Sequence, residues 1–266
     1  MNRVTEVVTF TPVYNEPARM VLNFDHEMKD VTDRLRPEVS FQHFFGSDGA
    51  LTFPAGMQGV LVEHQENMGL AKTLIDGFEA VLDARPDAEV LIRLDCQEHD
   101  PHKIPDIVEA FTATQTEALF LPVWYWWGKD RPPQRDIYKW VDDFWEALAP
   151  MDPSRIMEIY NKKFPLGYQA YRTDFLRKLL PKLRKALALF EGQNQKAATW
   201  GLDLLIMLIA ARNDRHLIDF MFGGYAEPWK ENRSSAKEAE QAKKAKAMVY
   251  VAKSLGCKIK TGMEIG

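Results

Sequence analysis

Residues 88–101, AEVLIRLDCQEHDP, join a buried strand to a cluster of acidic and polar side chains. Val90, Leu91 and Ile92 favour a pleated, buried position, so the apolar part predicts a strand over 88–94. The polar residues that follow are costly to place in a core, and open α/β sheets bind ligands just past the carboxyl ends of their strands. Two interpretations stay open here: a metal or phosphate site, and an acidic, proline-terminated turn that caps the next helix.

Apolar runs and amphipathic stretches alternate along the first half of the chain. The runs that predict strands cover residues 6–11, 39–45, 59–64, 88–94 and 118–124. The stretches that predict helices cover residues 20–35, 70–84, 174–190 and 199–212, and a last helix begins at Ser234 or Ser235 and ends at Gly256, a residue suited to a C-cap. This alternation predicts an α/β fold with a Rossmann-like, mostly parallel sheet flanked by helices.

The composition is that of an ordinary globular protein. Its 266 residues suit one large α/β domain, or one domain with an appendage, and the formal net charge of -4 argues against bulk nucleic-acid binding. Cys96 and Cys257 are the only cysteines, too few for a disulfide framework. Residues 1–17 lack a signal-peptide apolar region, and the longest apolar run, 204–211, is too short to span a bilayer. We expect a cytoplasmic protein with at most peripheral membrane contact; its oligomeric state is not given by the sequence.

Polar side chains follow each of the first four predicted strands. The segments are PVYNEP (12–17), SDG (47–49), QENMG (65–69) and DCQEHDP (95–101). Because the carboxyl ends of parallel strands share one edge of a sheet, we expect these segments to converge. Gly49 and Gly69 permit tight turns and a close ligand approach. Neither a GxxxxGKS/T loop nor a GxGxxG fingerprint is present, which argues against P-loop and dinucleotide-binding proteins.

Six segments in the same order resemble family 2 glycosyltransferases of the glycosyltransferase-A fold, especially the polyprenyl-phosphate mannosyl/glucosyltransferase branch. They are VVTFTPVYNEP (7–17), GSDG (46–49), ENMGLAKTLIDGFEAVLDA (66–84), VLIRLDCQEHDPHKIPDIVEAF (90–111), PLGYQAYRTDFLRKL (165–179) and WGLDLLIMLIAARNDRHLIDF (200–220). The resemblance implies a glycosyltransferase-A-like catalytic domain over 1–233, followed by a C-terminal helix and tail over 234–266.

The resemblance also implies a nucleotide-sugar donor. The residues that would contact it are Pro12, Tyr14, Asn15, Glu16, Asp48, Asn67, Gly69, Asp95 and Arg233. In this picture Asp48 accepts hydrogen bonds from N–H groups of the base, and Asn67 and Gly69 form the turn beside the nucleotide. Read from the residues alone, Asp48 has a second interpretation as a turn residue before a glycine, and Arg233 is equally part of a helix-start cluster.

Asp95 stands where the family has Asp-x-Asp, which holds a divalent cation against the diphosphate. The resemblance implies Mg²⁺ or Mn²⁺ with Asp95 and Gln97 as ligands, since hard cations prefer oxygen donors and such a cation neutralises the leaving group. The sequence departs from the family because Cys96 and Gln97 follow Asp95, and Glu98 or His99 could take the place of the missing carboxylate. Cys96 is either a buried, inert thiol or a catalytic one.

Asp203 matches the family's catalytic carboxylate. It would take the acceptor's proton in an inverting transfer, and its other interpretation is an N-cap of the apolar helix that follows. The acceptor is undecided between polyprenyl phosphate and a soluble glycan, protein or small metabolite. Two other functions stay open: a non-catalytic nucleotide-sugar-binding module, and a nucleotidyltransferase, which needs a Gly-rich basic loop that PVYNEP lacks.

Overall fold

The computed structural model describes most of the first 120 residues and shorter parts of the rest. The described ranges are 3–49, 53–54, 57–96, 100–120, 124–126, 169–192, 205–206, 218–220, 226–228 and 246–256. At 124–126, 218–220 and 226–228 the description covers the backbone alone.

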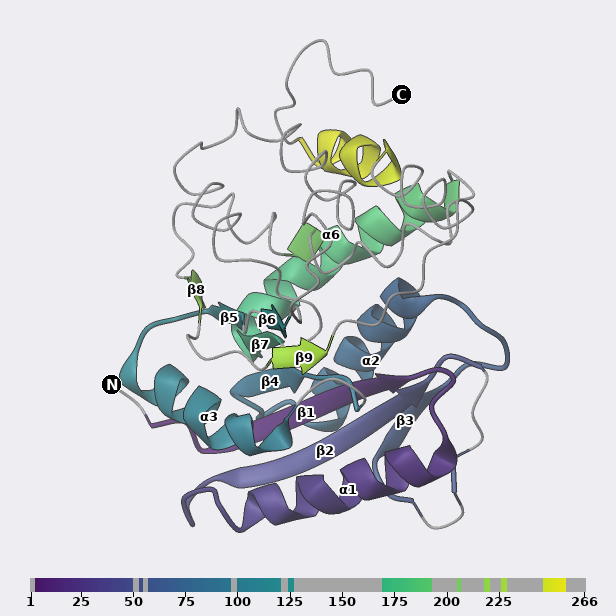
Figure 1. Ribbon diagram of the computed structural model, residues 1–266. Coiled ribbons are helices and arrows are strands. Elements are labelled where there is room, and N and C mark those ends of the chain that lie inside the picture. Colours follow the sequence, from purple (N-terminus) through teal and green to yellow (C-terminus); the bar gives the residue numbers. More distant parts are fainter. Residues whose placement is uncertain are drawn as a thin grey trace.

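A seven-stranded sheet with the order β3-β2-β1-β4-β7-β5-β8 forms the centre of the molecule (Figure 1). Its strands are β1 (Glu6–Val13), β2 (Ser40–Ser47), β3 (Val60–Glu63), β4 (Val90–Arg93), β5 (Ala118–Phe120), β7 (Gln169–Arg172) and β8 (Ile218–Phe220). Strands β1 to β4 are parallel, β5 is parallel to β8, and β7 is antiparallel to both of its neighbours, β4 and β5. The predicted mostly parallel sheet is confirmed.

The strand predicted over 118–124 is two strands. Strand β5 ends at Phe120, and β6 (Trp124–Trp126) pairs in parallel with β9 (Ala226–Pro228) in a separate two-stranded sheet. The sequence places Pro122 between them, and a proline has no N–H group to give to a ladder. The prediction of one strand was therefore wrong, because the apolar run contributes strands to two different sheets.

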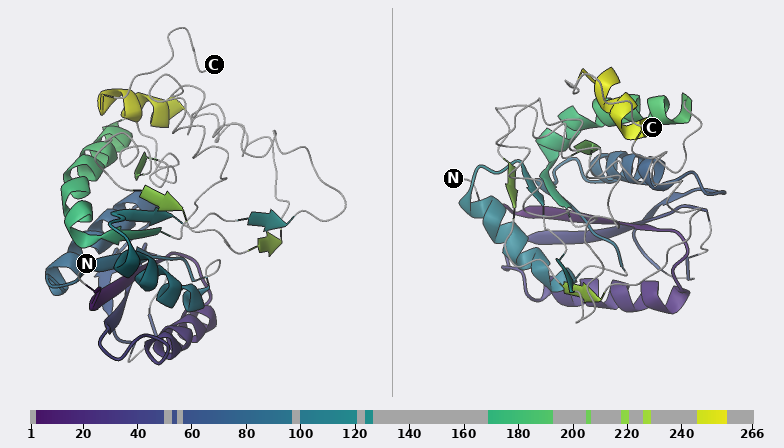
Figure 2. Two further views of the ribbon diagram at one scale, coloured as in Figure 1. Left: turned by 90° about the vertical axis from the view of Figure 1, so that its left-hand side faces the viewer. Right: turned by 45° about the horizontal axis from the view of Figure 1, so that its top comes forward.

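Helices cover both faces of the main sheet (Figures 1 and 2). Helices α1 (Ala18–Thr32) and α3 (Ile104–Ala113), the latter preceded by the 3-10 turn η1 (Pro101–Lys103), contribute to one hydrophobic cluster, and α2 (Leu70–Ala84) and α6 (Thr173–Gly192) contribute to the other. Neighbouring strand residues alternate between the clusters, as Val7 and Val8 do, because side chains of a strand point to opposite faces.

Helix α2 lies unusually close to the sheet at Gly77. A Cβ atom at Gly77 would lie 2.0 Å from the Phe10 ring, and one at Gly46 would lie 2.6 Å from the same ring. Phe10 is fully buried between these two glycines. Both glycines are therefore required by packing, which lets the middle of α2 lie close to β1 and β2.

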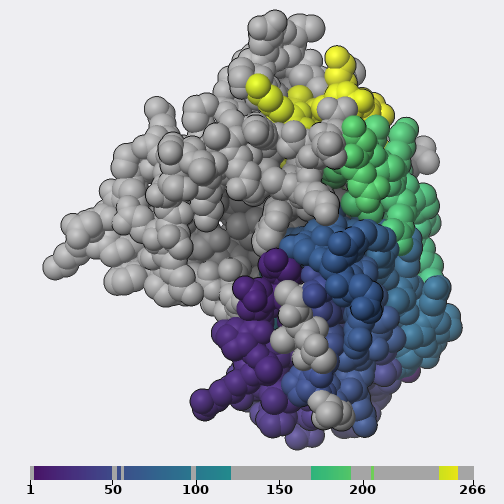
Figure 3. All heavy atoms as spheres, turned by 90° about the vertical axis from the view of Figure 1, so that its right-hand side faces the viewer, coloured from purple at the N-terminus to yellow at the C-terminus, as the bar shows by residue number. Residues whose placement is uncertain are grey.

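The C-terminal helix packs on the same face as α6. Residues 246–254 are helical, and Ala247, Met248 and Val251 belong to the cluster of α2 and α6. Figure 3 shows this helix beside α6 on the surface. Gly256 has φ +81° and its N–H donates to the Lys253 carbonyl at 2.8 Å, so the predicted C-cap is confirmed.

Several predicted features lie outside the described residues. These are the beginning of the last helix, the boundary between 1–233 and 234–266, and most of the helix over 199–212, of which residues 205–206 are helical and buried. Within the described ranges, no helix has the length and apolarity needed to cross a membrane.

Candidate functional site

Three neighbouring parallel strands end at one edge of the main sheet. The ends of β1 and β2 lie side by side, with Val13 opposite Ser47, and β4 runs along the other side of β1, with Arg93 opposite Phe10. We call the residues that follow these strands the polar edge: Tyr14, Asn15 and Glu16 after β1, Asp48 after β2, and Asp95 and Cys96 after β4. The polar strand ends lie close together because β2, β1 and β4 are adjacent and parallel.

The loop after β1 presents an aromatic ring to solvent. Tyr14 is 40% exposed, and its backbone N–H donates to the Glu16 carboxylate at 2.6 Å. Asn15 is exposed, whereas Pro12 is buried near the end of β1. The Glu16 side chain closes this loop, so that Tyr14 is held at the edge while its ring stays free to stack on a ligand.

Asp48 holds the turn that begins α2. Its backbone N–H donates to the Val13 carbonyl at 2.8 Å, which fixes it beside the end of β1. Its carboxylate accepts hydrogen bonds from the N–H groups of Met68 at 2.7 Å and Gly69 at 3.0 Å. Asp48 is only 5% exposed, so this carboxylate is first of all a structural tie between the polar edge and α2.

The turn itself depends on two glycines. Gly69 has φ +92°, and its N–H also contacts Oδ1 of Asn67 at 2.9 Å. Gly49 has φ +88°, and a Cβ atom there would lie 2.2 Å from the carbonyl carbon of Glu66. The tight turns predicted at Gly49 and Gly69 are confirmed, and the backbone of Gly49 lies against that of Glu66 and Asn67.

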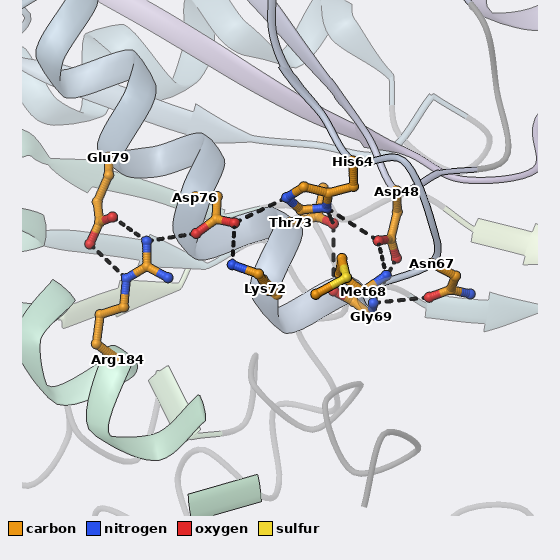
Figure 4. Close-up of polar contacts among 10 residues, drawn as sticks. All are labelled: Asp48, His64, Asn67, Met68, Gly69, Lys72, Thr73, Asp76, Glu79 and Arg184. Carbon is orange, nitrogen blue, oxygen red and sulfur yellow. Dashed lines mark hydrogen bonds and ion pairs between the residues drawn. The ribbon is translucent and has the colours of Figure 1, made fainter. Parts of the chain in front are cut away.

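A partly buried histidine connects this turn to the body of α2 (Figure 4). His64, directly after β3, has Nδ1 3.4 Å from Oδ1 of Asp48 and 3.2 Å from the Thr73 hydroxyl, and Nε2 3.0 Å from Oδ2 of Asp76. The sequence analysis did not find His64 or Asp76. The available signal was the spacing of Thr73 and Asp76, which places both on one face of the predicted helix.

The contacts continue from α2 to α6. Oδ2 of Asp76 accepts from Lys72 at 2.8 Å, and Oδ1 pairs with Arg184 of α6 at 2.6 Å. Arg184 also donates from Nε to Glu79 at 3.0 Å. Burial opposes the ionised form of Asp76, but the hydrogen bonds from Lys72 and Arg184 outweigh it and lower its pKa. We call Asp48, His64, Thr73, Asp76, Lys72, Arg184 and Glu79 the His64 network.

Asp95 is paired with a buried arginine, the last residue of the strand before it. Arg93 is 1% exposed, and its Nη2 lies 2.9 and 3.1 Å from the two oxygens of Asp95. Burial raises the pKa of the Asp95 carboxyl, and the charge of Arg93 opposes that rise. The sequence analysis missed Arg93, although a single arginine inside an apolar strand is a signal that a buried charge needs a partner.

Cys96 is a neutral thiol. Burial raises its pKa to about 12, helped by the negative charges of Glu16 and Asp95. The thiolate is the nucleophile in cysteine chemistry, so these surroundings argue against a catalytic thiol. The influence of Glu16 also shows that the loop after β1 comes close to the end of β4. An open pocket of about 380 Å³ lies beside Cys96, lined by Pro17, Arg19, Met20, Asn23, Phe24, Glu27 and Cys96.

The donor atoms of Asp95 suit a hard cation. Its side chain is 27% exposed, so the carboxylate oxygens are within reach of a ligand. The described part of the chain holds no group of three or more His, Cys, Asp or Glu residues arranged for a metal. Mg²⁺ does not need one, because it is commonly bound by one or two carboxylates, substrate phosphates and water. Asp95 therefore fits a cation that is shared with a diphosphate.

Most of the predicted site residues meet at the polar edge. The structure places there or directly beside it Pro12, Tyr14, Asn15, Glu16, Asp48, Asn67, Gly69 and Asp95. The predicted metal ligand Gln97, the predicted catalytic base Asp203 and the predicted donor-binding Arg233 lie outside the described residues, as do Glu98 and His99.

Comparison with known proteins gives a likeness in structure. No protein-family model matches the sequence, and no curated protein matches it. The structure is similar to that of mannosyl-3-phosphoglycerate synthase from Rubrobacter xylanophilus, with a TM-score of 0.57 and 10% identity over 98% of this chain and 78% of that one. It also matches S. aureus TarS 1-349, with a TM-score of 0.43 and 13% identity over 94% of this chain and 72% of that one, which is too weak a match to bear on the fold.

The first match confirms the predicted glycosyltransferase-A-like α/β fold. The match extends over 98% of this chain. Because only 10% of the aligned residues are identical, it shows a shared fold and nothing about shared function. This matched protein is named as a mannosyl-3-phosphoglycerate synthase and not as a polyprenyl-phosphate transferase, so that branch of the resemblance stays a prediction.

Proposed function

We propose that this protein transfers a hexose from a nucleotide-sugar to an acceptor, with inversion at the anomeric carbon. The observation that carries the proposal is the polar edge, where the ends of β1, β2 and β4 meet on a glycosyltransferase-A-like sheet. Ligands of open α/β sheets bind outside the carboxyl ends of the strands, which is where these side chains lie.

The donor's base and ribose would lie against the loop after β1. The exposed ring of Tyr14 offers a stacking face, and Asn15 and Glu16 offer hydrogen-bonding groups. Asp48 and the turn of Asn67 and Gly69 would border the base on the side of β2. Pro12 and Arg233 complete the proposed donor set, with Arg233 closing over the diphosphate.

A divalent cation, Mg²⁺ or Mn²⁺, would be held by Asp95 together with Gln97. When bound, it would neutralise charge on the departing nucleoside diphosphate. Arg93 contacts both oxygens of Asp95 and would hold the carboxylate in one orientation at the polar edge. The chain's own contribution is thus an oriented, partly desolvated carboxylate.

Asp203 would act as the general base. As the acceptor oxygen forms a bond to the anomeric carbon, the bond from that carbon to the diphosphate breaks, and the acceptor proton passes to Asp203. If the acceptor is a phosphate, it is already ionised and Asp203 positions it instead. Attack on the face opposite to the leaving group gives inversion.

The acceptor is either a polyprenyl phosphate or a soluble molecule. A polyprenyl phosphate would require peripheral contact with a membrane, and a soluble acceptor would not. The fold likeness to mannosyl-3-phosphoglycerate synthase makes a small phosphorylated metabolite the soluble acceptor to test first. Both acceptors present a phosphate group, so the same assay can compare them.

A thermal-shift screen tests the proposal. A ligand that binds the folded state raises the melting temperature by mass action, so one nucleoside diphosphate-sugar should stabilise the protein, more strongly with Mn²⁺. The metal-dependent part of the shift should disappear in Asp95→Ala. Polyprenyl phosphate and 3-phosphoglycerate are then offered as acceptors with the donor that binds. Binding without turnover would favour a non-catalytic module, and no shift with any nucleotide would overturn the proposal.

A further inference from the structure

We propose that His64 is a positioning residue of the donor site, and the inference rests on the proposed function above. His64 does not belong to the polar edge. It lies between Asp48, which holds the turn over 67–69, and Asp76, which is anchored on α2 (Figure 4). By contacting both carboxylates, His64 sets the orientation of that turn and therefore the affinity for the nucleotide.

The Asp48 carboxylate fixes the turn. It accepts from the N–H groups of two consecutive residues, Met68 and Gly69. A carboxylate that turned away would leave both N–H groups without this acceptor, in a place where Asp48 is 5% exposed. The position of the turn thus follows the position of one side chain.

His64 limits the movement of Asp48. The ring has polar neighbours on both sides: its Nδ1 lies 3.4 Å from Asp48 and 3.2 Å from the Thr73 hydroxyl, and its Nε2 lies 3.0 Å from Asp76. The backbone N–H of His64 donates to the Ser47 carbonyl at 3.1 Å, which ties it to the residue before Asp48. The side chain is 13% exposed, so water has little room to take its place.

The far end of this connection is rigid. Asp76 pairs with Lys72 on its own helix and with Arg184 on α6. Arg184 in turn binds Glu79, one helical turn from Asp76. Because α2 and α6 pack together in one hydrophobic cluster, Asp76 is a fixed point from which His64 can hold Asp48.

Paired substitutions of two partly buried histidines test this role. His64→Phe removes the polar contacts and keeps a flat ring, and His64→Gln keeps a polar group that can reach Asp76. His43→Phe is the matched control, because His43 lies on β2 with its ring against Phe24 and Phe45, in the cluster of α1 and α3. All variants are compared at a temperature where circular dichroism shows them folded.

Two measurements separate positioning from general stability. The first is hydrogen exchange of the Met68 and Gly69 amides without ligand. The second is calorimetric affinity for the nucleotide-sugar found in the screen. We expect His64→Phe to speed exchange at both amides and weaken binding about tenfold, about 1.4 kcal/mol, with partial recovery in His64→Gln and neither change in His43→Phe. In a turnover assay the donor KM should rise while kcat at saturating donor stays unchanged.

The outcomes distinguish the inference from the proposed function. Unchanged exchange at Met68 and Gly69 in His64→Phe overturns the inference, whatever the protein binds. Equal loss of affinity in His64→Phe and His43→Phe also overturns it, because the effect would then be one of stability. If the wild-type protein binds no nucleotide-sugar, the donor role of His64 fails together with the proposed function.

Discussion

Arg93, the last residue of β4, and Asp95, two residues further along the chain, form an ion pair in which a single guanidinium nitrogen contacts both carboxylate oxygens. Arg93 is inside the sheet and Asp95 is at its edge, with 1% and 27% of their side chains exposed. The pair therefore connects the core to the polar edge. It orients the carboxylate that the proposed function assigns to a divalent cation, and it explains why an arginine can stand in an apolar strand.

Replacing Arg93 by methionine should lower the free energy of unfolding by about 3 kcal/mol, because breaking a buried pair leaves a charge without compensation. Urea denaturation of the two proteins measures the difference. Arg3→Met is the control, since Arg3 pairs with Glu38 while its side chain is 71% exposed. An exposed pair should contribute less than about 1 kcal/mol. Equal effects of the two substitutions would contradict the structural role of Arg93.

Gly77→Ala should destabilise the protein by about 2 kcal/mol, because the new methyl group would overlap the Phe10 ring and force overpacking. Gly192→Ala is its control. Gly192 also belongs to a helix, but a Cβ atom there meets nothing within 4 Å. That substitution should leave stability equal or raise it by about 0.5 kcal/mol. A Gly77→Ala protein as stable as the wild type would show that α2 does not lie as close to β1 as described.

His43 should make the protein sensitive to acid. Burial lowers its pKa to about 3 in the folded state, whereas an unfolded histidine titrates near 6.5. Between these values the unfolded chain binds a proton that the folded protein does not, so stability falls as pH falls through this window. The loss should be about 1.4 kcal/mol per pH unit.

Urea unfolding at several pH values between 7 and 4 measures this dependence. His43→Phe should show a shallower slope by about one proton, although it also removes the hydrogen bond to Thr9. His26→Gln, at an exposed position of α1, should retain the wild-type slope. Equal slopes for wild type and His43→Phe would refute the buried, neutral state of His43.

Cys96 should react slowly with thiol reagents. Its pKa of about 12 leaves almost no thiolate at pH 8, so alkylation should be far slower than for a free cysteine and should accelerate at alkaline pH. The measurement uses a Cys257→Ser background, which leaves one thiol. Glu16→Gln should increase the rate, because the Glu16 charge contributes to the raised pKa.

Glu66→Gln is the control for this experiment, because it removes one carboxylate from the loop before α2 and Glu66 does not contribute to the pKa of Cys96. A rate unchanged by Glu16→Gln would show that the loop after β1 does not lie close to the end of β4. The experiment therefore tests the convergence of strand ends on which the site depends.

The first four strands and their helices were predictable because their signals are local. Alternating apolar runs gave β1 to β4 and the helices α1 and α2, and the polar residues after each strand gave the polar edge. Gly49, Gly69 and Gly256 were likewise readable from the chain, because a positive φ is a local requirement that glycine meets.

The antiparallel insertion of β7 between β4 and β5 was not predictable in this way. In this arrangement Gln169 lies opposite both Arg93 and Phe120, which are far from it in the sequence. The spacing of apolar residues along the chain does not predict which distant strands pair. The split of 118–124 into β5 and β6 was missed for the same reason, because an apolar run does not tell to which sheet each residue belongs.

The sequence by itself determined the α/β architecture and the residue types at the strand ends, since both depend on neighbours within a few positions. Only the tertiary structure decided what those residues do for one another. Asp48 meets Met68, Gly69 and His64, and Asp76 meets Arg184, because β2, β3, α2 and α6 are brought together by burial of a shared apolar cluster. Contacts of that kind arise from packing, which a linear pattern does not encode.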